Sequence, residues 1–419
     1  MNRSVLFLLL FVGTVSMAQQ IRQVSVGPGY ANQTYFSLSG GSTSSSLIED
    51  WDIAFNMNPM DASIFVNEGV ASGASAQGAL SLWVTPSTDF STVTLNDTTG
   101  FLRNPDVSWS EGAFNTPAVA GNPLDFGWGT YDFTTHEVTG SRVFIIELRN
   151  GLFKKLMIES LINGTYTFKW ADMDGGNLTT QTLDQTAYNK DLVFFSLEDN
   201  MVIDVEPNSW DMLFTRYSEL LDAGDGTFLE YNVGGALIAP GVLVAQANGV
   251  NPTTVNFANH EANLTDSVNV IGQDWRYFDL GSFSWITLDD RVYFVKTAND
   301  SLFQMTFLDF EGSSTGIVTF ETEYLGQYVS TNEYEELAGF AMYPNPAVGR
   351  INLTLDWQDG ATEAAYRIMD LQGRVVAERT FEVAPGFNRE TVELNAVPGM
   401  YVVDIVAGNA RTTERLIIQ

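Results

Sequence analysis

The chain has 419 residues, of which 45% are hydrophobic and 17% charged, so it is too long for one ordinary domain and apolar enough to exclude global disorder. Its 51 Asp and Glu against 20 Lys and Arg give a formal net charge of −31, which repels phosphate backbones and disfavours nucleic-acid binding. Cysteine is absent and only two histidines occur, His136 and His260. Disulfides, thiolate chemistry and multi-histidine metal clusters are therefore excluded.

The first residues have the pattern of an export signal. An early Arg3 is followed by an apolar run at 5–12 and by small residues around Ala18. The run is much shorter than the roughly 20 residues that span a bilayer. We therefore predict a signal peptide at 1–18, a mature chain that begins near Gln19, and no transmembrane anchor.

Two segments of the exported chain match at a fixed displacement. Residues 35–38 and 51–55 read Tyr-Phe-Ser-Leu and Trp-Asp-Ile-Ala-Phe, and residues 194–197 and 210–214 read Phe-Phe-Ser-Leu and Trp-Asp-Met-Leu-Phe, 159 positions later. Later matches keep their order with displacements of 149 to 157. We interpret this as two copies of one module, at 19–180 and 181–328.

The repeated motifs are typical of β-structure. Alternation places Trp51 and Ile53 on one face of a strand and Asp52 on the other, with the tryptophan as a core anchor. Each aspartate is expected to accept a backbone N–H or cap a turn rather than to catalyse. Asn-Gly turns and β-rich runs follow. Residues 217–221 are interpreted as a helical turn in otherwise β-rich modules.

A polar, acidic segment at 329–339 predicts a linker, and the remaining residues 340–419 contain short alternating strands separated by turn signals. This pattern predicts a small immunoglobulin-like β-sandwich. Three motifs stand out in it, and they comprise Tyr343, Pro344, Asn345 and Pro346, then Asp370, Gly373 and Arg374, then Pro398, Gly399 and Tyr401.

In that order, these motifs resemble the type A sorting domain of the type IX secretion system. The resemblance covers residues 340–419. It implies a Bacteroidota-type bacterium, passage through the outer membrane by the type IX machinery, and removal of this domain by a sortase-like peptidase. The expected location is extracellular or on the outer cell surface, tethered or released.

The repeated segments are similar to the HmuY family of haem-binding proteins. The similarity is carried by 35–38, 51–55, 131–136, 153–156 and 164–168 in the first copy. It implies β-rich modules that clasp haem, so the expected fold class is all-β with two HmuY-like modules and the C-terminal sandwich.

Haem requires one or two axial ligands such as imidazole or thioether. The resemblance makes His136 the candidate iron ligand, and alternation on one strand makes Met157 a candidate second ligand. The 149 displacement puts Trp285 at the position of His136 in the second copy. His136 as a loop histidine bonded to a neighbour is the alternative, and His260 is expected to be a solvated surface residue.

Two functions remain open from the sequence. One is surface capture of haem or a related porphyrin without turnover. The other is a structural or adhesive surface protein whose modules no longer bind haem. No catalytic motif such as a Gly-x-Ser-x-Gly elbow or a phosphate loop occurs, so we do not expect an enzyme.

Overall fold

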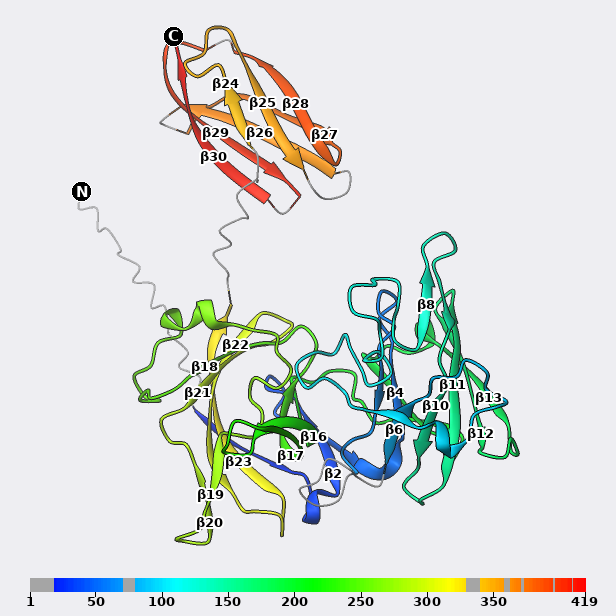
Figure 1. Cartoon of the computed structure of the whole chain (residues 1–419). Helices are drawn as coiled ribbons and strands as arrows, with labels where there is room; N and C mark the ends of the chain where they lie inside the picture. Colours follow the sequence, from blue (N-terminus) through cyan, green and yellow to red (C-terminus); the bar gives the residue numbers. More distant parts are fainter. Residues whose placement is uncertain are drawn as a thin grey trace, which may run out of the picture. The chain divides into compact units, whose positions relative to one another are not determined.

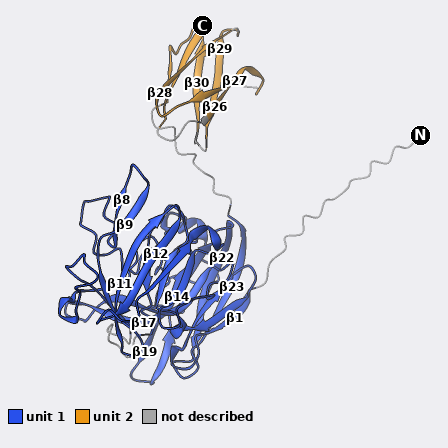
Figure 2. Ribbon diagram, turned by 90° about the vertical axis from the view of Figure 1, so that its right-hand side faces the viewer, with its two compact units in different colours: residues 1–328 blue, residues 329–419 orange. Residues whose placement is uncertain are grey.

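The computed structural model describes residues 19–70, 80–328, 340–357, 362–370, 373–394, 396–408 and 410–419. The chain forms two compact units, one up to Tyr328 and one from Val329 (Figure 2). In the described residues both units consist mainly of strands joined by loops, with six 3₁₀ helices of three residues each in unit 1, which confirms the all-β prediction. The predicted signal peptide and the predicted linker at 329–339 lie outside the described residues.

Unit 1 is built from two outer sheets, two inner sheets and a separate two-stranded sheet (Figure 1). The first outer sheet has the order β13(Thr179–Asp184), β12(Thr165–Asp172), β11(Phe153–Ile162), β10(Phe144–Glu147), β6(Ser81–Val84) and β7(Thr99–Leu102), and the hairpin β8(Gly129–Asp132)–β9(Glu137–Gly140) joins it at β11. The first inner sheet has the order β15(Met201–Ile203), β14(Leu192–Ser196), β4(Ile53–Asn56) and β5(Ile64–Val66).

The other two sheets come mainly from later residues. The second inner sheet has the order β17(Phe228–Ile238), β16(Met212–Asp222), β2(Asn32–Phe36) and β3(Thr43–Leu47). The second outer sheet has the order β1(Gln20–Ser25), β23(Ile317–Gln327), β22(Ser301–Phe310), β21(Val292–Lys296) and β18(Leu243–Ala247), and β19(Arg276–Asp279) pairs with β20(Ser284–Thr287).

Aromatic side chains join each inner sheet to its outer sheet. The Phe55 ring of β4 lies 4.9 Å from the Phe168 ring of β12. In the other half, the Phe36 ring of β2 lies 5.2 Å from the Phe320 ring of β23. The inner strands β2 and β4 are buried at nearly every position, as expected for sheets covered on two faces, whereas the outer strands β12 and β23 alternate buried and half-buried residues. The sheets of unit 1 therefore stack as layers, with the inner sheets facing each other.

The two halves of unit 1 exchange strands. The early strand β2 pairs with β16, and the later strand β14 pairs with β4. At the edges of the outer sheets, β1 pairs with β23 and β13 pairs with β12. The start of the chain thus completes the sheets of residues 212–327, and residues 179–203 complete the sheets of residues 53–172.

The exchanged strands keep the same register in both halves. Tyr35 lies opposite Leu213, and Phe194, which is 159 positions after Tyr35, lies opposite Ala54. A bulge follows Ile158 in β11 and another follows Phe307 in β22, 149 positions later. The predicted modules, 19–180 and 181–328, therefore do not coincide with the two stacks of one inner and one outer sheet. Each stack contains strands from both segments.

Two local predictions were wrong. Residues 217–221 belong to β16, where they pair in register with β17, so continuous ladder hydrogen bonds prevail over the local helical pattern. Trp51 does not share a face with Ile53, because the strand begins only at Ile53 and Trp51 precedes it. Trp51 packs in the same core as Ala54, whereas Ile53 packs in the core shared with the first outer sheet. Burial of both tryptophans of the repeated motif was predicted correctly.

Unit 2 is the expected small two-sheet domain. One sheet has the order β24(Ala341–Tyr343), β25(Arg350–Trp357) and β28(Gly386–Glu393), and the other has the order β27(Val375–Val383), β26(Thr362–Asp370), β29(Gly399–Ala407) and β30(Ala410–Ile418). Leu353, Ile368 and Val403 are fully buried in its core. The core thus draws on strands of both sheets, as in a sandwich.

Candidate functional site

The aspartate of each Trp-Asp motif holds an exchanged strand. The Leu197 N–H donates to Asp52 Oδ2 at 2.7 Å, and the Leu38 N–H donates to Asp211 Oδ2 at 2.7 Å. Leu197 follows β14 and Leu38 follows β2, so each carboxylate binds the copy of the motif that lies far away in the chain. The predicted backbone role of these aspartates is confirmed.

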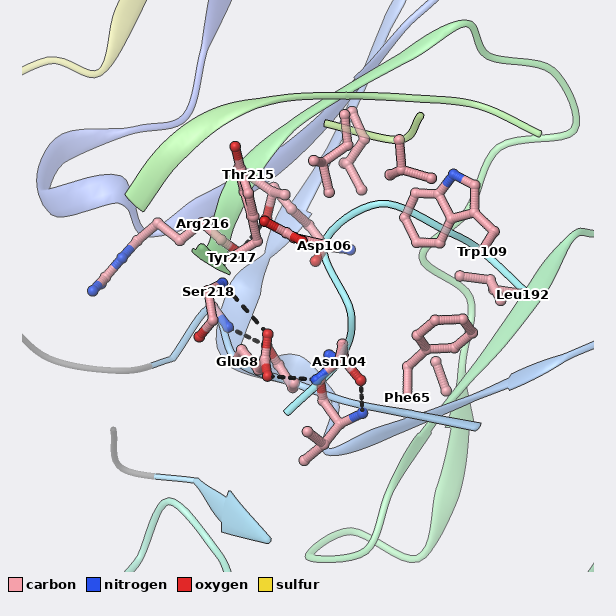
Figure 3. A pocket seen from close by; sticks show the side chains of 18 of the residues that line it. Phe65, Glu68, Asn104, Asp106, Trp109, Leu192, Thr215, Arg216, Tyr217 and Ser218 are labelled. Carbon is pink, nitrogen blue, oxygen red and sulfur yellow. Dashed lines mark hydrogen bonds between the residues drawn. The ribbon is translucent and has the colours of Figure 1, made fainter. Parts of the chain in front are cut away.

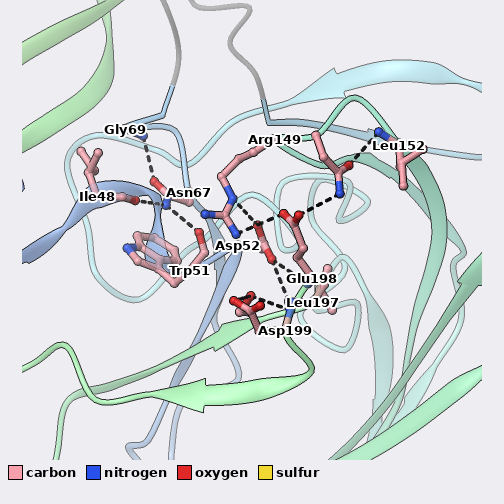
Figure 4. A network of polar contacts seen from close by, with 12 residues as sticks. Ile48, Trp51, Asp52, Asn67, Gly69, Arg149, Leu152, Leu197, Glu198 and Asp199 are labelled. Atoms are coloured by element: carbon pink, nitrogen blue, oxygen red, sulfur yellow. Dashed lines mark hydrogen bonds and ion pairs between the residues drawn. The ribbon is translucent and has the colours of Figure 1, made fainter. Parts of the chain in front are cut away.

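Asp52 also belongs to a charged network (Figure 4). Its Oδ1 lies 3.2 Å from Arg149 Nε, and Arg149 Nη2 lies 3.5 Å from Glu198 Oε2. The side chain of Asp52 is fully buried. Burial raises the pKa of Asp52, while Arg149 and the backbone donors act in the opposite direction. A buried, paired carboxylate of this kind stabilises the junction between the strands rather than offering a free reactive group.

A pocket lies between the two inner sheets (Figure 3). It contains about 690 Å³ of space not filled by atoms, including space open to solvent. Its apolar wall combines residues of both inner sheets with the loop after β7, and they include Ala54, Phe65, Leu192, Phe194, Leu213, Leu237 and Trp109. The Trp109 indole donates to the Ile238 carbonyl at 2.7 Å, which fixes this loop to the second half.

Two carboxylates contribute to the pocket wall. Glu68 Oε1 accepts the Asn104 N–H at 2.8 Å and lies 3.9 Å from Arg103 Nη1. Burial raises the pKa of Glu68 to about 7, against the opposing effect of Arg103. Burial also raises the pKa of Asp106, whose Oδ2 accepts a hydrogen bond from Asn269 at 3.1 Å.

Gln33 of β2 adds an unpartnered donor to the same wall. Its Oε1 accepts the Trp51 indole N–H at 3.0 Å, which assigns the orientation of the amide. Its Nε2 is buried and has no hydrogen-bond partner, and the residue is only 2% exposed. Buried donors of this kind are rare in folded proteins and call for an explanation.

His136 lies elsewhere, in the tip of the β8–β9 hairpin. Its side chain is exposed, its φ is +59°, and its Nδ1 is 2.7 Å from the Tyr131 hydroxyl. The contact with a neighbouring hydroxyl corresponds to the alternative that the sequence left open. His136 does not line the pocket between the inner sheets.

The structure does not bring Met157 to His136. Met157 lies on the face of β11 that carries Phe153, as predicted, and it packs on a small satellite core with Val143 and Ile145. The register pairs Leu161 of β11 with Val138 of β9, so His136 lies beside the end of β11 that carries Ile162. Five to six residues of extended strand, about 20 Å, separate that end from Met157. The two side chains cannot clasp one iron.

The equivalent hairpin of the second half carries a phenylalanine. The β19–β20 hairpin repeats β8–β9 with a displacement of 147, and Phe283, with φ +51°, takes the place of His136. The sequence displacement of 149 pointed to Trp285 instead, because it did not allow for a two-residue difference in loop length. His260 is half-buried and stacks on Phe294 at 5.8 Å, so it is less solvated than expected.

The motifs of unit 2 have structural roles. Asn345 Oδ1 accepts the Ile417 N–H at 2.9 Å, which ties the Tyr-Pro-Asn-Pro segment to the last strand. Asp370 binds the Arg374 backbone and guanidinium at 3.0 Å across the turn, where Gly373 has φ +80°. The Tyr401 hydroxyl donates to the Val397 carbonyl at 2.8 Å.

Two family models match the chain. Residues 341–419 match the secretion system C-terminal sorting domain. The protein is therefore a secreted or outer-surface protein of the Bacteroidota type, directed there through type IX secretion. Residues 29–171 match the HmuY protein family. This HmuY domain includes β2, which pairs in the second half, as well as strands of the first half.

No curated protein matches the chain. Among solved structures, apo PinO from Porphyromonas gingivitis is 10% identical, with 75% of this chain and 100% of that chain covered and a TM-score of 0.23. Dimeric latent PorU from Porphyromonas gingivalis is 8% identical, with 95% of this chain and 34% of that chain covered and a TM-score of 0.16. At these scores neither likeness defines the fold.

Among the described residues, no group of three or more His, Asp or Glu side chains has the arrangement of a metal site. In the same part of the chain, no helix has the length and hydropathy needed to cross a membrane. Sequence reasoning missed the pocket, whose wall runs from Gln33 to Val268. The matched motifs at 51–55, 194–197 and 210–214 were the available signal, since each contributes residues to the wall.

Proposed function

We propose that this secreted or surface protein binds haem or a related porphyrin through His136 and catalyses no reaction. The match of residues 29–171 to the HmuY family, which is associated with haem, is the observation that carries the proposal. Neither matched family is enzymatic. We also propose that unit 1 derives from two HmuY-like modules and that a sortase-like peptidase removes residues 340–419 during export.

The residues around His136 fit one axial ligand. Because Nδ1 faces the Tyr131 hydroxyl, Nε2 is the nitrogen that would bind the iron. Phe133, 68% exposed on the same hairpin, offers an apolar surface to a porphyrin. Bound haem would supply an iron that the imidazole of His136 would hold, as histidine does in other haem proteins. Met157 does not fit as the second ligand.

A haemin titration of the chain from Gln19 onward tests this proposal. We expect a shifted Soret band in the native protein and its loss in His136→Ala. His260→Ala and Met157→Leu are the matched controls, and both should keep the shift. The proposal fails if native protein gives no shift, or if His136→Ala keeps it.

The alternative is a structural or adhesive surface protein. It is favoured by the exposed position of His136 at a hairpin tip and by Phe283 at the equivalent tip. Adhesion of the native protein to cells or matrix polymers, unchanged in His136→Ala and without a Soret shift, would support this alternative.

A further inference from the structure

The pocket between the inner sheets is separate from the His136 hairpin and has the walls of a binding site for an aromatic molecule. Phe194 and Phe65 approach it from the first inner sheet, and Leu213 approaches it from the second. The Trp109 ring lies 5.8 Å from the Phe65 ring in an edge-to-face arrangement. Concave sites lined by aromatic residues with a few polar groups are typical of small-molecule sites.

The polar groups of the pocket favour a ligand that carries a hydrogen-bond acceptor. Gln33 Nε2 is a buried donor without a partner, and its Oε1 is already occupied by the Trp51 indole. An unpaired buried donor costs free energy, which a ligand that accepts this hydrogen bond would recover. A purely hydrocarbon ligand would leave that donor unpaired.

The charged side chains around the pocket disfavour an anionic ligand. Glu68 and Asp106 both line it. The Arg216 guanidinium is directed away from Trp109 and Phe65 (Figure 3), and its Nε donates to Asn232 Oδ1 at 2.6 Å.

We propose that this pocket is a second ligand site, specific for a compact, uncharged aromatic molecule that carries a carbonyl-type hydrogen-bond acceptor. Its walls come from exchanged strands of both halves, so it exists only when β2 and β14 are in place. The site differs from the porphyrin site in position and in ligand charge, because Asp106 in its wall opposes the propionates of a porphyrin.

The uncharged naphthalene ketone prodan, 6-propionyl-2-(dimethylamino)naphthalene, is a suitable probe. We expect the full chain from Gln19 to bind prodan with a blue-shifted emission. The anionic analogue 6-(dimethylamino)naphthalene-2-sulfonate should bind about tenfold more weakly or worse. Equal binding of the sulfonate would contradict the proposed preference for an uncharged ligand. If prodan does not bind, the proposal that this pocket is a ligand site is wrong.

A variant that fills the pocket with a larger side chain tests whether prodan binds there. Ser108 lines the pocket in the loop before Trp109, whereas exposed Ser110 does not line it. Ser108→Trp should weaken prodan binding by about tenfold or more, and Ser110→Trp should leave it unchanged. Circular dichroism melting checks that both variants fold. Unchanged binding in folded Ser108→Trp would contradict the proposal. Haemin binding in Ser108→Trp should be normal, which separates this test from that of the porphyrin site.

Discussion

The two halves of unit 1 use the same hydrogen bond at the exchanged strands but differ in their turns and hairpin tips. Asp52 and Asp211 each accept a leucine N–H at 2.7 Å. The arginine that pairs with Asp52, Arg149, has Ala298 at the equivalent position 149 residues later. The hairpin tip carries His136 in one half and Phe283 in the other. Strand pairing thus constrains the interior, whereas the tips and turns can gain or lose a ligand group.

The largest expected effect comes from the aromatic residues that fill the layers at the exchanged strands. Phe36 and Phe195 occupy equivalent places and are both almost fully buried. Phe36→Ala and Phe195→Ala should each lower the free energy of unfolding by about 3–5 kcal/mol, because each leaves a cavity. Urea unfolding of the two variants measures the effect. A nearly neutral Phe36→Ala would show that β2 does not complete the second half.

Phe387→Ala in unit 2 is the control for these variants. Its side chain is 73% exposed, so its removal should leave the unfolding of unit 1 unchanged. A loss comparable to that of Phe36→Ala would mean that the measured transition is not specific to unit 1.

Glu68 gives the first half a pH dependence. Its folded pKa of about 7 lies above the usual 4.5 because burial disfavours the carboxylate, despite Arg103. The unfolded chain releases this proton first, so stability should fall as the pH rises from about 4.5 to about 7 and then level off, a loss on the order of 3 kcal/mol. Glu68→Gln should be less sensitive to pH over that range in urea unfolding.

Exposed Glu49 provides the matched control. Glu49→Gln should keep the pH dependence of the native protein. If Glu68→Gln also keeps it, the pH dependence arises elsewhere, for instance at Glu206, whose pKa burial also raises to about 7.

A smaller effect distinguishes the two motif aspartates. Asp52→Asn removes the anionic partner of Arg149, so it should cost about 2 kcal/mol. Asp211→Asn keeps an oxygen for the Leu38 N–H, and Asp211 forms no ion pair within the part of the chain that the structure describes, so the substitution should cost about 1 kcal/mol. Thermal unfolding of the two variants measures the difference. Equal or reversed losses would contradict a stabilising role for Arg149.

The sequence predicted the β-class, the buried tryptophans and the backbone role of the aspartates, since these follow from local pattern. It could not predict the exchange, because Tyr35 and Phe194 are similar residues that suit either Trp-Asp strand. The pocket forms only because the strands are exchanged, so the sequence could not predict it either. Residues 217–221 were misjudged because a local pattern does not show that β17 lies alongside.

The most direct test of the exchange is disulfide formation in this cysteine-free chain. Gln23 of β1 lies opposite Thr319 of β23, with Gln23 Nε2 and Thr319 Oγ1 3.2 Å apart. The double variant Gln23→Cys/Thr319→Cys should therefore form an intramolecular disulfide on mild oxidation. The equivalent position in the first half, Thr167, pairs with Thr182, so Gln23→Cys/Thr167→Cys should stay reduced. Crosslinking of residue 23 to residue 167 instead of 319 would contradict the exchange of strands between the halves.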